Sequence, residues 1–152
     1  MAMARVFFSI EHRDLSKHQL APRQAHMVTE GLKRMFPDED DEEHDLIAQL
    51  AAADDNLRNL KDEPFRLVVA ADADVTEGAD PDDPSLITIN QPVAWSKVAA
   101  IFTDEQDASP DVLAARQGSE EAFDALAGWE MLWYHPSERL RLAEELRGYT
   151  EW

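Results

Sequence analysis

The chain has 152 residues, 44% of them apolar and 30% charged, and its 32 acids outnumber 14 bases to give a net charge of −18. This length suits one globular domain spanning residues 1–152. Cysteine is absent, which excludes disulfides, thiolate nucleophiles and cysteine-ligated metals, and the five scattered glycines form neither a phosphate-binding loop nor a dinucleotide turn.

The negative charge narrows the classes of partner. It repels nucleic-acid backbones and anionic lipid headgroups, so neither nucleic acid nor a membrane is expected as a direct partner. Residues 1–37 contain six bases and three acids, a net of +3, whereas residues 38–152 contain eight bases and 29 acids, a net of −21. The N-terminal part could contact an acidic surface, its own or that of a second copy in a homodimer. The alternative is that the charge serves only to keep the protein dissolved.

The hydropathy of the chain bears on its location. No segment approaches the ~20 apolar residues of a bilayer-spanning helix, and the first ten residues lack the apolar core of a signal peptide. A cytoplasmic location is therefore expected.

The first third of the chain predicts one strand and two short helices. Val6–Ile10 is rich in aromatic and β-branched residues, which is typical of a strand. Residues 12–20 predict a helix that ends before Pro22. Thr29 suits the N-cap of a second helix, which runs through Phe36.

A run of seven acids in eight residues, 38–45, leads into a helix of about twenty residues. Apolar residues at spacings of three and four mark it as amphipathic: Leu46, Leu50, Ala53, Leu57 and Leu60. The acids lie where the helix dipole favours them. His44 within that run could hold a cation with Asp41 and Asp45, but a solvated helix start explains the same pattern.

Three strands are predicted in the middle of the chain. They are Phe65–Ala73, Leu86–Ile89 and Val98–Thr103. The first and the third are apolar on both faces, which indicates that both faces are covered. An acidic loop, 74–84, separates the first two strands.

The last third predicts two helices, a strand and a helix. Ser109 and the proline after it favour a helix start, and Gly118 ends this helix before a second one through Leu126. Trp129–Tyr134 predicts a strand, and residues 138–147 predict the last helix.

This order of elements predicts an α+β fold with a single mixed β-sheet of about 4–5 strands packed with helices. An elaborated ferredoxin-like core is one candidate. A three-layer α/β arrangement is the other.

Carboxylates follow two of the predicted strands and are candidate metal ligands. If these strands are parallel neighbours, their carboxyl ends meet at one edge of the sheet, where Mg²⁺ could bind. The acidic loop 72–83 also alternates oxygen ligands as calcium loops do, but it lacks the EF-hand glycine and the final glutamate. The candidate metal ligands are Asp72, Asp74, Asp104 and Asp107.

The aromatic segment near the C-terminus is a candidate binding surface. Alternation in Trp129–Tyr134 places Trp129 and Trp133 on one face of the strand and Tyr134 on the other. Tryptophan and tyrosine dominate interface energetics, so these residues and Trp95 are candidate partner contacts. The alternative is a core strand with a large aromatic content.

Three segments carry a resemblance to a known family. LWYHPSE at 132–138, VVAAD at 68–72 and VAAI at 98–101 resemble an uncharacterised family of small acidic actinobacterial proteins, a domain of unknown function. The resemblance implies a compact α/β domain in a bacterial cytoplasm. It implies no catalytic residues.

These observations favour a non-enzymatic interaction protein that binds a partner with a basic surface and needs no cofactor. Charge would speed the encounter, and the tryptophans would anchor the complex. The alternative is a metal-dependent enzyme that uses the strand-end carboxylates with magnesium or calcium.

Overall fold

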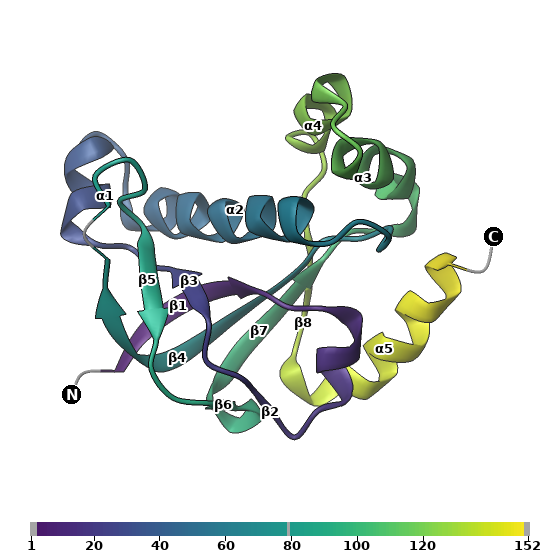
Figure 1. The fold of residues 1–152 in the computed structure, drawn as a ribbon, viewed down its shortest axis with the longest axis horizontal. Helices are drawn as coiled ribbons and strands as arrows, with labels where there is room; N and C mark the ends of the chain where they lie inside the picture. Colours follow the sequence, from purple (N-terminus) through teal and green to yellow (C-terminus); the bar gives the residue numbers. More distant parts are fainter. Residues whose placement is uncertain (1–2, 79, 151–152) are drawn as a thin grey trace.

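A computed structural model describes residues 3–78 and 80–150 and shows helices packed around antiparallel strands (Figure 1). The strands are β1 (Met3–Ser9), β2 (Gln19–Leu20), β3 (Gln24–His26), β4 (Leu67–Glu77), β5 (Leu86–Ile89), β6 (Val93–Ala94), β7 (Val98–Thr103) and β8 (Leu132–Tyr134). The helices are α1 (Glu30–Met35), α2 (Asp41–Asn59), α3 (Ser109–Arg116), α4 (Glu120–Leu126) and α5 (Arg139–Arg147). Among these residues, no helix has both the length and the apolar character needed to span a bilayer.

The main sheet has six strands in the order β1-β3-β5-β4-β7-β8, and β2 pairs with β6 in a separate ribbon. β1 also pairs with β4, so β1, β3, β5 and β4 close into a small barrel. The predicted α+β class is confirmed. The sheet differs in detail from the prediction, since it has six strands, its pairings are antiparallel, and its closure departs from a ferredoxin-like core.

β4 is the longest strand and organises the sheet. Its first half pairs with β1 on one side and with β7 on the other, and its last residues pair with β5. Residues 67–71 are buried, as their continuous apolar run predicts for a strand covered on both faces.

α2 crosses one face of the sheet. Ala48, Ala52 and Ala53 of the helix pack on Phe7 of β1 and Val68 of β4, among other residues of this face. Small side chains let the helix approach the strands closely. The N-terminus is capped as the acid run predicts, since the Asp40 side chain accepts a hydrogen bond from the Glu43 N–H.

The other face of the sheet carries the largest core. Phe8, Val69 and Ile101 are buried there against Leu142 and Leu146 of α5. A third and smaller cluster joins the C-terminal end of α2 to α3 and α4 and is formed by Leu57, Val112 and Leu126. Burial of these apolar side chains provides the main stabilisation of the fold.

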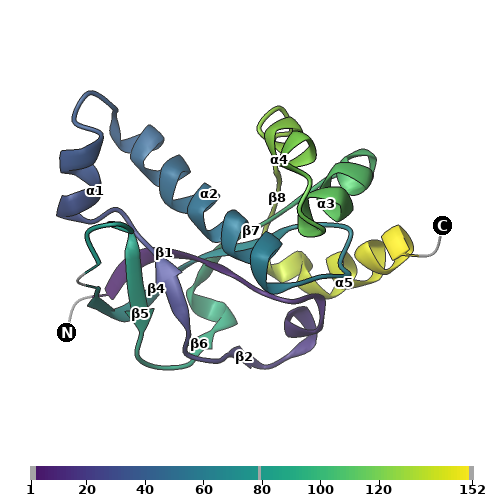
Figure 2. The same cartoon turned by 45° about the horizontal axis from the view of Figure 1, so that its top comes forward.

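The chain reverses between α3 and α4 at Gly118. Its φ of +99° lies in the region that side chains with a Cβ rarely adopt. Ser119 then caps α4 by accepting a hydrogen bond from the Ala122 N–H. The predicted boundary between these two helices is confirmed. The reversal places α4 next to α3 (Figure 2).

Several predicted elements differ in extent from the structure. The strand predicted at Phe65–Ala73 is β4, Leu67–Glu77, which runs into the predicted loop 74–84. Residues 12–20 form only a 3-10 helix, His12–Ser16, and then the strand β2. The Asp14 side chain bonds to the Glu11 N–H and tightens this turn, and Lys17 is extended, so the helix stops there. The last strand begins at Leu132 rather than at Trp129, because the chain first turns at the end of α4.

Candidate functional site

A groove lies between α2 and α4, and we call it the α2–α4 groove. Its volume is about 220 Å³. It is lined by Leu50, Asp54, Leu57, Arg66, Phe123, Leu126, Ala127 and Trp129. In Figure 1 both helices lie above the strands, with α2 across the sheet and α4 towards the top right.

The walls of the groove expose large apolar side chains. Leu46 and Leu50 on α2 are each 42% exposed, and Phe123 on α4 is 46% exposed. The leucines are four residues apart and share a face of the helix. The sequence pattern places both leucines in the core stripe, but the sheet beneath α2 is covered by the alanines, and the leucines face the groove instead.

The sheet continues this apolar surface beside the groove. Phe102 of β7 pairs with Trp133 of β8, so both lie on the face of the sheet that α2 crosses. Met131 precedes them on this face, and its sulfur lies 3.9 Å from Nε2 of Gln49 on α2. Trp133 is 59% exposed, because α2 covers β1 and β4 and leaves the β8 edge open.

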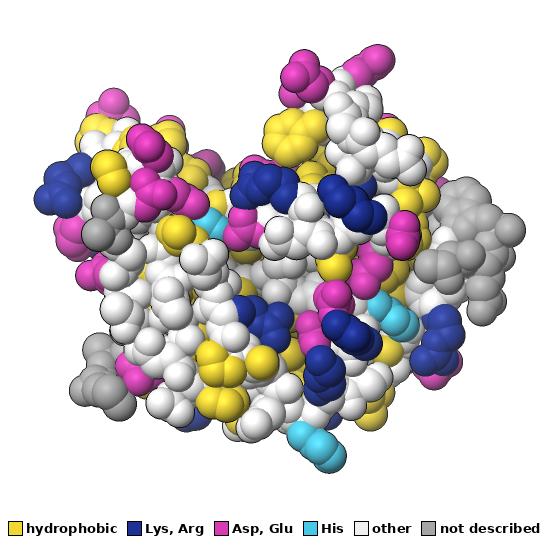
Figure 3. Space-filling view, in the orientation of Figure 1, with side chains coloured by type: hydrophobic (Ala, Val, Ile, Leu, Met, Phe, Trp, Pro, Cys, Tyr) yellow, Lys and Arg dark blue, Asp and Glu magenta, His cyan; other side chains and the backbone are white. Residues whose placement is uncertain are grey.

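Both helices that form the groove carry exposed acidic side chains, at the start of α2 and along α4. Exposed acids lie in the first turns of α2 and along α4: Asp41, Glu42, Glu43, Asp45, Glu120, Glu121 and Asp124. The one base that lines the groove, Arg66, is buried and held by Asp104 at 2.7 Å. In Figure 3, acidic side chains at the tip of α4 stand directly above an apolar patch.

Asp54 is the one acid that lines the groove itself. Burial raises the pKa of its carboxyl above the ordinary value, and the charges of Arg58 and Arg66 offset this only in part. The next residue has the opposite behaviour. Burial would also raise the pKa of Asp55, but hydrogen bonds and charge from His26 and Arg58 outweigh it and lower that pKa.

The structure brings two of the four predicted partner residues to this surface. Trp129 lines the groove, where its indole N–H donates to Asp111 Oδ2 at 3.0 Å, and Trp133 lies beside it on β8. Trp95 lies elsewhere, with the Arg139 guanidinium 4.9 Å from its ring centre. Tyr134 points to the opposite face of the sheet, with its hydroxyl 3.5 Å from Glu145.

The predicted metal ligands are not brought together. β4 and β7 are antiparallel, so the ends of these strands lie at opposite edges of the sheet. Asp104 is buried against Arg66, at the start of β4, whereas Asp72 pairs with Arg5 near its end. Within residues 3–78 and 80–150, no three acids or histidines are grouped so as to hold a metal ion. This holds for the other candidate positions as well, which are Asp74, Asp107, His44 and the described residues of the loop 72–83.

A second polar cluster lies on another flank of α2, and no sequence motif predicts it. His26 Nδ1 lies 2.7 Å from Ser85 Oγ, and its Nε2 lies 2.7 Å from Asp55 Oδ2. These are the residue types of a Ser-His-Asp hydrolase. However, His26 and Ser85 are only 2% and 3% exposed, and the Ser85 hydroxyl donates to Asp83 Oδ1 at 3.3 Å.

A cavity larger than the α2–α4 groove lies next to this cluster but does not reach the serine. Its volume is about 580 Å³, and Asp55, Asp83, Arg23 and Arg58 are among its lining residues, whereas Ser85 is not. A nucleophile without access to a substrate cannot act, so the cluster is better explained as a buried link between α2, β3 and the loop before β5.

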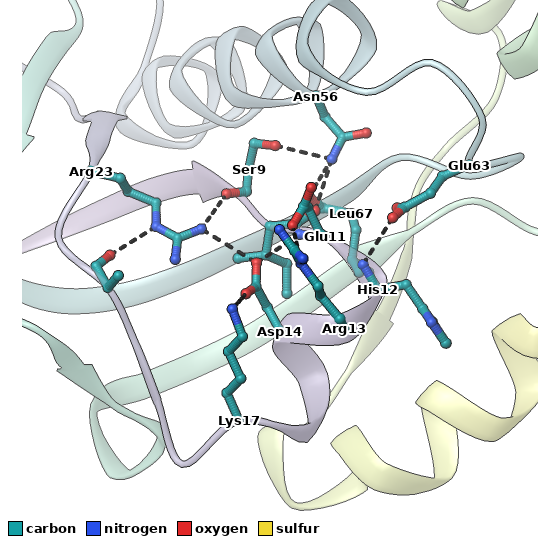
Figure 4. Close-up of polar contacts among 12 residues, drawn as sticks. Ser9, Glu11, His12, Arg13, Asp14, Lys17, Arg23, Asn56, Glu63 and Leu67 are labelled. Carbon is teal, nitrogen blue, oxygen red and sulfur yellow. Dashed lines mark hydrogen bonds and ion pairs between the residues drawn. The ribbon is translucent and has the colours of Figure 1, made fainter.

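The bases of the N-terminal part are largely paired with acids (Figure 4). Asp14 forms ion pairs with Lys17 at 3.0 Å and with Arg23 at 3.6 Å, and Arg13 forms one with Glu11 at 2.6 Å. Basic and acidic side chains are accordingly interspersed over the front of the molecule below α2 (Figure 3). This local pairing reduces the attraction of the N-terminal part for an acidic surface.

Asn56 joins this region to the core. Its side-chain amide donates to Ser9 Oγ and to the Ile10 and Leu67 carbonyls at 3.0–3.1 Å, and its Oδ1 accepts from Arg116 (Figure 4). Burial lowers the pKa of Arg116 to about 10, so its guanidinium stays charged at neutral pH. The end of α2 is therefore fixed firmly.

No curated protein and no solved structure matches this chain. The model of a family of unknown function matches residues 4–142, nearly the whole chain. The expected membership of such a family is confirmed, whereas an actinobacterial setting stays a prediction. On this match, the chain belongs to the family of unknown function DUF6912.

Proposed function

We propose that this protein is a non-enzymatic interaction module, and that its α2–α4 groove binds an amphipathic helix with basic residues on a partner protein. The observation that carries this proposal is the apolar groove with Asp54 in its lining and exposed acids on α4, which forms one wall. Leu50, Phe123 and Trp133 provide the exposed apolar surface. Large exposed apolar patches on folded proteins typically mark interaction sites.

A helix is the occupant that suits the shape of the site. The groove has a helix on each side and apolar side chains along both walls, as in complexes where an amphipathic helix lays its apolar face into a groove. Leu46 lies one turn before the lining Leu50 and extends the exposed apolar surface of α2. The partner is expected to present apolar residues at spacings of three and four.

Charge complementarity makes the partner basic. Exposed acids lie on α4, which forms one wall, Asp54 lies in the lining, and the lining Arg66 is neutralised by Asp104. An acidic helix would be repelled, whereas a basic one would be drawn to the groove over about a Debye length, ~8 Å at physiological salt. This charge is expected to act mainly on the rate of association.

The proposal can be tested with a fluorescent model peptide of about five helical turns, with leucines at helical spacing and lysines elsewhere. Binding is followed by fluorescence anisotropy at two salt concentrations. Phe123→Ala and Leu50→Ala are expected to weaken binding by about 5- to 30-fold, as residues of an interface centre do. A peptide with glutamate in place of every lysine should not bind.

Leu140→Ala is the matched control for Leu50→Ala. Leu140 is also an exposed helical leucine, at 57%, but it lies on α5. Equal losses from both substitutions, or no loss from either, would contradict the groove as the binding surface.

The charge is tested separately. Neutralising Glu120, Glu121 and Asp124 together should slow association and reduce its salt dependence, whereas neutralising Glu77 and Asp82 should have a smaller effect. An unchanged salt dependence in the α4 variant would remove the charge argument.

A further inference from the structure

Asp54 has an environment unlike that of its neighbours on α2. Within residues 3–78 and 80–150, no hydrogen bond or ion pair joins its carboxylate to another side chain. Asp55, by contrast, pairs with both His26 and Arg58. Asp54 is half-buried all the same, and it lines the apolar groove.

The surroundings of Asp54 are mostly apolar. Leu50, Leu57 and Leu126 line the groove around it, together with the rings of Phe123 and Trp129. The positive charge of Arg66 is engaged elsewhere, since its guanidinium makes two hydrogen bonds to Asp104 at 2.7 and 3.0 Å. The groove therefore holds one carboxylate among apolar walls, and the charges of Arg58 and Arg66 compensate it only in part.

The size of the site indicates what can enter it. Its volume of about 220 Å³ is below the range of roughly 300–1,000 Å³ that is usual for small-molecule sites. One long side chain fits this space better than a cofactor or a metabolite does. A purely apolar side chain would remove the carboxylate from water without giving it a partner, which is unfavourable.

We propose, on the basis of the proposed function, that Asp54 selects the anchor residue of the partner helix, which is a lysine or an arginine. Its aliphatic stem lies between Leu50 and Phe123, and its cationic group meets the Asp54 carboxylate. Long basic side chains combine an apolar stem with a charged head in the way this site requires. The Trp129 ring adds a surface on which a cation is favoured.

The anchor is tested with a pair of model peptides that differ at one central position, lysine in one and the isosteric apolar norleucine in the other. Asp54→Asn is expected to weaken binding of the lysine peptide about tenfold and to leave the norleucine peptide nearly unchanged or slightly tighter. Asp124→Asn, an exposed acid on α4, is the control and should affect both peptides alike. Equal effects of Asp54→Asn on both peptides would overturn the inference.

A small probe separates this inference from the proposed function. n-Butylammonium carries only the stem and the charge, and its binding is followed by NMR through the methyl signals of Leu50, Leu57 and Leu126. These signals are expected to shift with n-butylammonium, to shift much less with 1-butanol, and to lose the difference in Asp54→Asn. Equal shifts with both compounds would overturn the anchor, whatever the peptides do.

If the peptides bind and respond to Leu50→Ala but not to Asp54→Asn, the proposed function holds and the anchor fails. If n-butylammonium binds at Asp54 and no peptide responds to Leu50→Ala, the cation site holds and the helix as its carrier fails.

Discussion

Two flanks of α2 differ in whether their acidic side chains have hydrogen-bond partners. On one flank, Asp55 is joined to His26 and Arg58, and His26, which is 2% exposed, is also joined to Ser85. On the other flank, Asp54 lines the α2–α4 groove, and among the residues that the structure describes no side chain forms a hydrogen bond or an ion pair with its carboxylate. Consecutive carboxylates on one helix thus have different surroundings, one closed by partners and the other open to the groove.

The largest effect is expected where a buried charge pair is broken. Asp104 is fully buried and accepts hydrogen bonds from the backbone and the guanidinium of Arg66. Asp104→Ala leaves Arg66 buried and unpaired, so the free energy of unfolding should fall by about 3–5 kcal/mol. Urea denaturation measures this loss. A loss no larger than that of an exposed substitution such as Asp107→Ala would contradict the paired arrangement.

His26→Ala tests the closed flank. The substitution removes both ring nitrogens and leaves Asp55 and Ser85 without their partner, which should cost about 2–4 kcal/mol in unfolding free energy. Thermal and urea unfolding both report it. Ser85→Ala should cost less, because Asp55 keeps its bond to His26. Hydrolysis of model esters that Ser85→Ala abolishes would show instead that the cluster is catalytic.

The two carboxylates should respond to pH with opposite signs. The folded-state pKa of Asp55 lies below 3.8, so its stabilisation is present above that pH and is lost as the pH falls through the folded pKa. The folded-state pKa of Asp54 lies above 3.8, so its ionisation destabilises the fold at neutral pH and ceases to do so in acid.

The comparison is made with Asp55→Asn and Asp54→Asn. At neutral pH the first is expected to destabilise the protein and the second to stabilise it. As the pH falls, the Asp54 difference should shrink above pH 3.8, whereas the Asp55 difference should shrink below it. Melting temperatures measured from neutral to acid pH give both curves. The same sign for both variants at neutral pH would refute the contrast between the flanks.

The smallest effect on stability is expected from Phe123→Ala. Its ring is 46% exposed, and exposed substitutions usually change stability by about 0.5 kcal/mol or less. The same variant should weaken peptide binding strongly, so stability and binding separate at this residue. A large loss of stability would mean that the ring supports α4 rather than a ligand.

The sequence predicts those parts of the fold that depend on local patterns. The acid run and the capping residues place α2 and α4 correctly, and the apolar run identifies β4 as a doubly covered strand. β3 and β6 have two or three residues each, too few for a pattern, and they form only because neighbouring strands supply their partners.

The candidate site is predicted only in part. Aromatic content identifies Trp129 and Trp133, but nothing in the spacing shows that Trp95 stacks on Arg139 instead. Leu50 shows the same limit, because periodicity gives the apolar face of a helix and not the neighbour that covers it. The cluster of His26, Asp55 and Ser85 depends on contacts between residues 29 and 59 positions apart, for which single-sequence patterns carry no signal.

The closure of β1 against β4 also limits the ways in which another protein can be recognised. A strand from another protein can add only to an unpaired edge of a sheet, and the strands of the barrel already have neighbours on both sides. β8 retains a free margin, but its three residues offer few backbone groups for a ladder. Backbone pairing is indifferent to sequence, whereas side-chain recognition is not. Selectivity for a partner can therefore change through a few surface substitutions while the barrel itself stays constant.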